Sequence, residues 1–120
     1  MGAHNGKLFA SVSFSESQTE LNADQVTITL VKSGDNWLLK VGTQYISYSG
    51  SKNEVYLTTS TDTSAQWTIT VDANGNATIK NVATTERLLQ YNSSNPRFVC
   101  YKATSNQLSP VIYLVEGLNA

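Results

Sequence analysis

Apolar and polar residues alternate along much of this chain with a period of two. In residues 25–31, Val26, Ile28 and Leu30 fall on one side, and threonines separate them. Successive side chains of a β-strand point to opposite faces, so this alternation predicts a strand with one buried face.

Residues 66–72 repeat the alternation, and there Trp67, Ile69 and Val71 are expected to point inward. Short runs rich in β-branched and aromatic residues predict further strands. These runs are residues 45–48, 54–59, 77–82, 97–101 and 111–115.

Turn-forming residues separate the predicted strands. The Asn-Gly pair at 74–75 is a strong signal for a tight hairpin, because both residues tolerate positive φ. Residues 15–25 are polar and acidic and are expected to form a long loop or a single turn. No segment of ten or more residues has a helical stripe, so an all-β fold is predicted. The predicted turns are at 33–36, 49–53, 72–76 and 92–96.

Two stretches of the chain resemble each other at a spacing of about 42 residues. Gln25 aligns with Gln66, and a Thr-Ile-Thr triplet follows each of them. Further on, Tyr48 aligns with Tyr91, and a Ser-rich turn follows each tyrosine. The two ends of the chain resemble pieces of a third copy. The predicted pseudo-repeats are about 25–65 and 66–110.

A period near 40 residues with about four strands per unit fits a β-trefoil or a propeller blade. Fewer than three copies cannot close a propeller. We therefore predict one domain, residues 1–120, that forms a β-trefoil-like closed barrel of about 10–12 short antiparallel strands. One hairpin arm is expected to be missing between the terminal fragments. The alternative is an antiparallel β-sandwich or an open barrel.

The amino-acid composition adds an expectation about the cellular location of the protein. Charged residues make up 14% of the chain, well below the quarter that is usual. The chain has 14 Ser, 14 Thr and 11 Asn, a balance typical of extracellular all-β modules. Net charge is −1, and the eight Lys and Arg are scattered. No nucleic-acid footprint is expected, and no apolar run reaches the ~18 residues of a membrane helix.

Three stretches carry a resemblance to a known kind of domain. They are "GDNWLLKV", "AQWTITVDANGNATIKN" and the pattern R-x-L-x-Y-N-S-x-x-x-R-F-x-x-Y from Arg87 to Tyr101. From about Gly34 to Leu114, the chain resembles a β-rich module carried by many secreted and surface proteins of gut Bacteroidetes. Two strands that normally precede the N-terminal segment in that module are expected to be missing here. The resemblance implies a non-catalytic accessory domain outside the cell, and it brings no set of functional residues.

Catalytic chemistry is poorly represented in this sequence. His4 is the one histidine, the nine acidic residues are dispersed, and Cys100 is the one cysteine. Cys100 lies in an apolar strand and is expected to be a small buried residue rather than a nucleophile. Asp72 begins a faint calcium-loop pattern that lacks its closing acidic residue. We therefore predict no enzyme activity, no cofactor and no metal site.

Binding is better supported than catalysis. Sugars are recognised by aromatic faces together with amide, carboxylate and guanidinium groups. Trp67, near the start of the second pseudo-repeat, is expected in the core, as are the aligned Tyr48 and Tyr91; the functional alternative is that Tyr91 or Tyr101 faces out. Arg97 is expected to be solvated or paired unless it contacts a ligand. The candidate ligand-binding residues are Tyr91, Asn92, Asn95, Arg97, Tyr101 and Tyr45.

Two functions from different classes follow. The first is an extracellular or cell-surface accessory module that binds carbohydrate or a cell-surface polymer. The second is a structural or protein-interaction domain of a larger surface protein, without a small-molecule site. Polysaccharide or a surface protein is the expected partner, nucleic acid and membrane insertion are not expected, and the isolated domain is expected to be a monomer.

Overall fold

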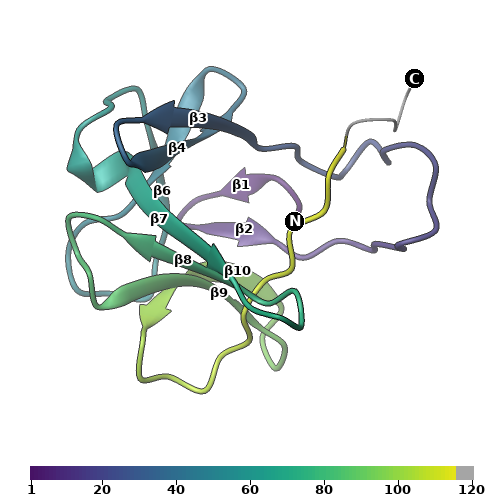
Figure 1. Cartoon of the computed structure of the whole chain (residues 1–120). Helices are drawn as coiled ribbons and strands as arrows, with labels where there is room; N and C mark the ends of the chain where they lie inside the picture. Colours follow the sequence, from purple (N-terminus) through teal and green to yellow (C-terminus); the bar gives the residue numbers. More distant parts are fainter. Residues whose placement is uncertain (116–120) are drawn as a thin grey trace.

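The protein is an all-β domain in which one antiparallel sheet curls into a nearly closed barrel (Figure 1). The computed structural model describes residues 1–115. Within that range, ten strands belong to a single sheet, and the only helical element is one short 3₁₀ turn. The barrel prediction is therefore confirmed over the two-sheet alternative.

The ten strands are two to six residues long, and most of them form antiparallel hairpins with the next strand in the sequence. Their bounds are β1 His4–Asn5, β2 Leu8–Ala10, β3 Thr29–Ser33, β4 Asn36–Val41, β5 Gln44–Ser47, β6 Tyr56–Thr58, β7 Gln66–Val71, β8 Ala77–Asn81, β9 Arg87–Asn92 and β10 Arg97–Lys102, with the 3₁₀ turn η1 at Thr63–Ala65.

The sheet runs in the order β1-β2-β10-β9-β8-β7-β4-β5-β6, and β3 pairs with β4 beside this path. The segment before β6 brings the two ends of the sheet together. The Val55 amide donates to the Lys7 carbonyl at 3.0 Å, and the Cys100 amide donates to the Glu54 carbonyl at 3.1 Å. The His4 ring adds a bond from Nε2 to the Val55 carbonyl at 2.8 Å. Closure of this kind protects sheet edges from pairing with other chains.

Trp67 lies at the centre of the core and is fully buried, as predicted. It stands opposite Trp37 where β7 pairs with β4. Its indole Nε1 donates to the Ile46 carbonyl at 2.9 Å, so the one polar atom of the ring is satisfied. Tyr48 and Cys100 are also fully buried, which confirms the core assignment of both.

Arg87 is a buried cation that the sequence did not single out. Only 1% of it is exposed, and its guanidinium holds the loop between β5 and β6. Nη1 donates to Asn53 Oδ1 at 2.7 Å and to the Cys100 carbonyl at 3.2 Å. Nη2 donates to the Ser51 carbonyl at 2.7 Å. The guanidinium also lies 5.3 Å from the centre of the Tyr48 ring, an arrangement that favours a cation over an aromatic face.

The predicted inward faces of two strands are partly wrong. Leu30 is 43% exposed and Val71 is 58% exposed. Leu30 lies in β3, an edge strand that pairs only with β4 in the described part of the chain, and it is not part of the buried cluster. Val71 is the last residue of β7 and lies where the strand leaves the barrel. Alternation identified the strands but could not show where the core ends.

Two predicted strands are shorter than expected or absent. The strand predicted at 25–31 begins only at Thr29, because the residues before it are held elsewhere. The Val26 amide donates to the Met1 carbonyl at 2.9 Å, and Gln25 Nε2 donates to the Ser13 carbonyl at 2.8 Å. The strand predicted at 111–115 is wrong as well. Only an isolated bridge between Val111 and Asn76 forms there.

The hairpin predicted from Asn74 and Gly75 does form, between β7 and β8. Its turn is wider than a two-residue connection, because Asp72 organises it. The Asp72 carboxylate accepts from the backbone amides of Asn74 and Asn76 at 2.8 and 3.0 Å. Gly75 supplies the positive φ, at 85°. The faint calcium-loop pattern is thus a carboxylate-capped turn.

Candidate functional site

A groove of about 1030 Å³ is lined mainly by apolar side chains, and we call it the apolar groove. It lies between the barrel, the segment that precedes β3 and the segment that follows β10. Aliphatic side chains predominate among the residues that line it. They are Met1, Ser11, Val12, Phe14, Leu21, Gln25, Val26, Thr27, Ile28, Thr29, Leu30, Leu39, Ile69, Ile79, Leu89, Tyr91, Phe98, Leu108, Ser109, Pro110, Val111, Ile112, Tyr113, Leu114 and Val115.

Two irregular segments form the walls of the groove. One is the arm, residues 11–28, which extends away from the barrel between β2 and β3 (Figure 1). The other is the C-terminal segment, residues 103–115, which passes the barrel and reaches the arm. The rings of Phe14 and Tyr113 meet with centres 4.7 Å apart, and the Tyr113 hydroxyl donates to Glu16 Oε1 at 2.6 Å. These contacts join the two walls.

Backbone hydrogen bonds fix the C-terminal segment on the barrel. Leu108 and Tyr91 exchange two bonds, each 2.9 Å, and the Ala77 amide donates to the Pro110 carbonyl at 2.8 Å. Beyond Pro110, apolar side chains stand in solvent. Ile112 is about half exposed, and Leu114 is 78% exposed. The segment is therefore anchored beside β8 and β9 while its last apolar residues remain uncovered.

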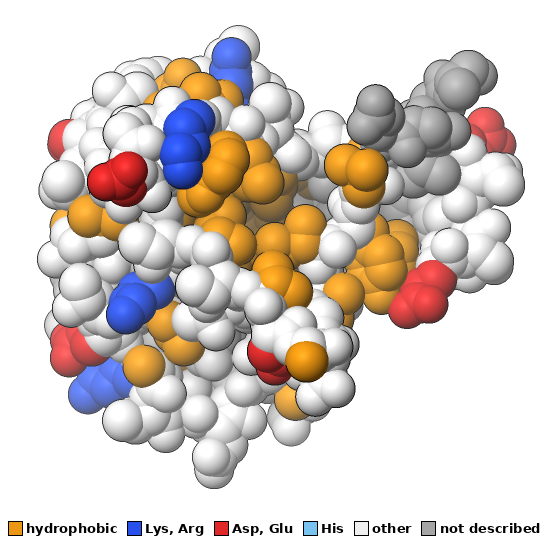
Figure 2. Space-filling model, viewed as in Figure 1, with side chains coloured by type: hydrophobic (Ala, Val, Ile, Leu, Met, Phe, Trp, Pro, Cys, Tyr) orange, Lys and Arg blue, Asp and Glu red, His pale blue; other side chains and the backbone are white. Residues whose placement is uncertain are grey.

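The floor of the groove is continuous with the core. Leu39, Ile79 and Leu89 belong to the buried cluster and also line the groove. Ile69 and Phe98 are half-buried residues packed against that cluster. Figure 2 shows the consequence: apolar side chains gather in a band that runs from the barrel body toward the arm. Contiguous apolar surface of this kind marks an interaction site in most proteins that carry it.

Amide side chains give the arm a defined shape. Gln18 and Gln25 are bonded to each other, with Nε2 of Gln18 donating to Oε1 of Gln25 at 2.6 Å. The Asn22 amide donates to the same Gln25 oxygen at 3.0 Å. The Ser15 amide also donates to Gln18 Oε1 at 3.2 Å. The polar loop predicted at 15–25 is thus an ordered wall of the groove.

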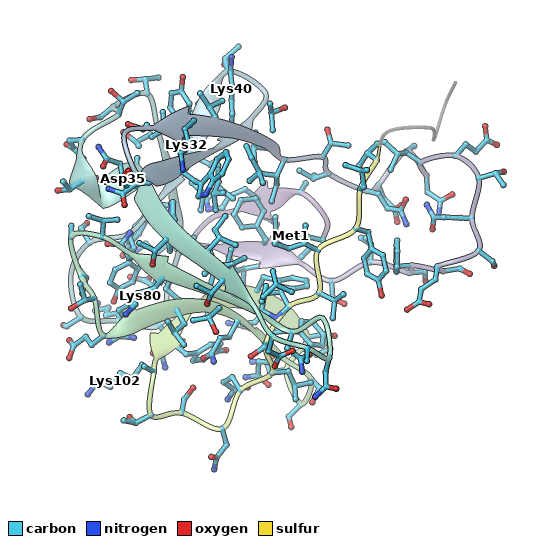
Figure 3. The ribbon with its side chains drawn as sticks, in the orientation of Figure 1. Met1, Lys32, Asp35, Lys40, Lys80 and Lys102 are labelled. Atoms are coloured by element: carbon cyan, nitrogen blue, oxygen red, sulfur yellow. The ribbon has the colours of Figure 1, made fainter. Side chains whose placement is uncertain are left out.

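The charge around the groove is one-sided. The arm carries Glu16, Glu20 and Asp24, and residues 8–31 contain no Lys or Arg. The C-terminal segment has no charged residue. Figure 3 shows the labelled lysines on the barrel body, away from the arm. Donation to Glu16 raises the pKa of the Tyr113 hydroxyl.

The Met1 ammonium is the one cationic group among the residues that line the groove. Burial lowers the pKa of this ammonium, and the carboxylate of Asp24 opposes that shift. The groove therefore combines an apolar floor with an acidic wall.

The six residues predicted to bind a ligand do not form one site. Tyr91 lines the apolar groove, half-buried, with its ring 4.8 Å from that of Phe98 and its hydroxyl 3.0 Å from Ser11 Oγ. Tyr101 is only 7% exposed, and its hydroxyl accepts from Asn92 Nδ2 at 3.1 Å. Tyr101 therefore packs in the core, and it also lines the polar hollow at Arg87 that is described below.

The remaining predicted residues lie outside the groove. Asn92 Oδ1 accepts from the amides of Ser94 and Asn95, each at 3.0 Å, and so shapes the hairpin turn. Asn95 is exposed on that turn, and Arg97 is half-buried at the start of β10. Tyr45 lies on β5, which is separated from β9 by β4, β7 and β8 in the sheet.

A second, polar hollow of about 550 Å³ lies above Arg87. Ser51, Asn53, Lys102 and Ser105 are among the residues that line it. The Arg87 guanidinium at its base is already committed to Asn53 and two backbone carbonyls. We therefore interpret this hollow as a by-product of the structural contacts of Arg87, and not as a ligand site.

The groups most often used in catalysis are engaged elsewhere. Burial raises the pKa of the Cys100 thiol, which favours the unreactive protonated form. His4 stacks edge-on against Phe9 with ring centres 4.9 Å apart. In the described residues, no three His, Cys, Asp or Glu side chains come close enough to hold a metal ion. Nor does any helix in that range have the length and apolar character to cross a membrane.

The groove residues were missed from sequence because they come from distant segments. Phe14 and Tyr113 are separated by almost the whole chain, and a period-two pattern says nothing about such a contact. One signal was present in the sequence. The apolar run 111–115 had no predicted strand partner, and an apolar run without a partner indicates uncovered surface.

Comparison with known proteins adds no name to this site, since no family model and no curated protein matches the sequence.

Proposed function

We propose that this chain is a non-catalytic binding module that docks a segment of another polypeptide in the apolar groove. The observation that carries the proposal is the groove itself, whose floor is core and whose rim is uncovered. At about 1030 Å³, it reaches the upper limit of the roughly 300–1,000 Å³ typical of small-molecule sites. An apolar groove of that size can hold a chain segment.

The lining favours a polypeptide over a sugar. Sugar sites offer open aromatic faces beside free hydrogen-bonding groups. Here the Tyr91 ring packs against Phe98, and the Tyr113 ring packs against Phe14. Most of the other lining residues are aliphatic. Binding of carbohydrate or a surface polymer stays a separate prediction from the sequence, centred on the exposed turn at 92–97.

The proposal includes the trefoil-like arrangement and the extracellular setting. The hairpins β3–β4 and β5–β6 are followed by β7–β8 and β9–β10, an order that supports two successive units of four strands. In this arrangement, β1–β2 and the C-terminal segment are the pieces of a third unit, and the groove lies beside them. The low charge and the abundance of Ser, Thr and Asn support a secreted accessory domain.

Selection from a random peptide display library tests the proposed docking. The wild-type chain should enrich peptides, and those peptides should lose at least about tenfold in affinity, or 1.4 kcal/mol, for the Ile112→Asp variant. A carboxylate there would be desolvated by any apolar segment that covers it. Calorimetric titration of the enriched peptides measures the change.

Val71→Asp provides the matched control. Val71 is an aliphatic residue that is 58% exposed, against 45% for Ile112, and it does not line the groove. Its replacement should leave the affinity within about twofold of wild type. Equal loss of binding in both variants would refute docking in the groove, and so would enrichment of no peptide at all.

A further inference from the structure

We infer that the polypeptide docked in the groove is an extended strand with Lys or Arg residues, which pairs with the open edge of β3. This inference rests on the proposed function and names the class of its partner. Three features carry it: the unpaired edge of β3, the exposed apolar side chains at the rim of the groove, and the acidic arm.

The edge of β3 is the first feature. Within residues 1–115, β3 pairs only with β4, so every second N–H and C=O of this strand points away from the sheet. Thr29 and Leu30, at the start of β3, line the groove. An open strand edge beside an apolar groove is the arrangement used in β-augmentation, in which a peptide adds a strand to a sheet.

The other end of β3 limits how far a partner can pair. The Lys32 ammonium lies 4.5 Å from the centre of the Trp37 ring, so a cation occupies that end (Figure 3). Charged residues on an edge strand oppose further pairing. The partner strand is therefore expected to pair along the first part of β3, next to the groove.

The apolar rim sets the pattern of the partner. Successive residues of an added strand would point alternately into the groove and toward solvent. The inward residues would cover Leu30, Ile112 and Leu114, which are exposed apolar side chains at the rim. An alternating apolar and polar sequence meets both requirements.

The arm supplies the charge selection. Glu16, Glu20 and Asp24 are exposed on the arm, which forms one wall of the groove, and residues 8–31 contain no Lys or Arg. The Met1 ammonium is partly buried and interacts with the Asp24 carboxylate. Lys or Arg at the ends of the docked strand would complement the remaining carboxylates, and Asp or Glu there would be repelled.

Three nine-residue probe peptides test this inference by calorimetric titration. The first is Lys-Thr-Val-Thr-Val-Thr-Val-Thr-Lys, the second has Glu at both ends, and the third is the first peptide N-methylated at alternate residues. The lysine peptide should bind at least about tenfold more tightly than either of the others. In 1 M NaCl, where charges more than ~3 Å apart are screened, the lysine and glutamate peptides should converge.

An arm variant isolates the electrostatic part. The combined replacement Glu16→Gln, Glu20→Gln and Asp24→Asn should bind the lysine and glutamate peptides within about twofold of each other. Equal affinity of wild type for these two peptides, or full affinity for the N-methylated one, would overturn the inference. Absence of binding by all three would also overturn it. Docking itself is decided separately by the library selection, which uses no designed sequence.

Discussion

Replacing Trp67 with Ala should lower the free energy of unfolding by about 3–5 kcal/mol, the range for loss of a buried aromatic side chain. The Trp67 ring is fully buried in the main cluster. The Ile46 carbonyl would also lose its bond from the indole Nε1. An unsatisfied carbonyl at a buried position adds to the cost of the cavity. Urea unfolding followed by far-ultraviolet circular dichroism measures the loss.

Trp37→Ala is the matched control for this substitution. Trp37 stands directly opposite Trp67 across the β4–β7 pair, but it is only half-buried. Its removal is expected to cost less than half as much stability as removal of Trp67, because a half-buried side chain has less apolar surface shielded from water. Equal losses for the two variants would show that the core is not centred on Trp67.

The second large effect is expected at Arg87. Its replacement by Met keeps much of the side-chain length but leaves Asn53 Oδ1 and the Ser51 and Cys100 carbonyls without their charged donor. Each buried acceptor left without its partner costs roughly 1–3 kcal/mol, so the loss summed over three acceptors should be several kcal/mol. The loop between β5 and β6 should also open, since Arg87 makes two hydrogen bonds to it, one to Asn53 and one to the Ser51 carbonyl.

Two measurements check the Arg87 prediction. Urea unfolding gives the change in stability, and hydrogen exchange reports the opening of residues 49–55. Arg87→Lys keeps a positive charge but cannot reach all three oxygens, so it should recover only a minor part of the loss. If Arg87→Met matched wild type in both measurements, the claim that the guanidinium stabilises the fold and holds the loop would be wrong.

The pattern of the sequence predicted most of the fold because the relevant signals are local. Alternation around Trp67 and the Asn-Gly pair are both contained within a few residues, and both gave the correct element. The exposure of Leu30 and Val71 was not local information. It depends on which strands lie beside β3 and on where β7 leaves the barrel, so alternation alone assigned those two residues to the wrong environment.

The site was much harder to predict than the fold. Tyr101 was a candidate by residue type, yet on β10 its side chain points into the core and is buried. Tyr91 is the one predicted residue that lines the groove. The arm and the C-terminal segment meet only through contacts between opposite ends of the chain, such as Phe14 with Tyr113. No periodicity within a short window carries that information.

The acidic wall illustrates the same limit. Glu16, Glu20 and Asp24 were recognised as members of one polar loop, and that part of the prediction needed only their spacing. Their proposed role in charge selection depends on the apolar floor beside them. That floor includes Leu39 and Ile79, which lie on β4 and β8 and belong to the buried core as well as to the lining of the groove. Charge and apolar surface become a site only when the fold brings them together.

Mapping of backbone amide shifts by nuclear magnetic resonance, during titration with a library-selected peptide, tests the central claim most directly. Docking in the groove predicts the largest shifts at Thr29 and Leu30 on β3, and from 108 to 114 in the C-terminal segment. Small shifts are expected at the hairpin turn 92–97. Shifts concentrated at that turn, with the groove amides unchanged, would contradict the account and favour binding at the turn instead.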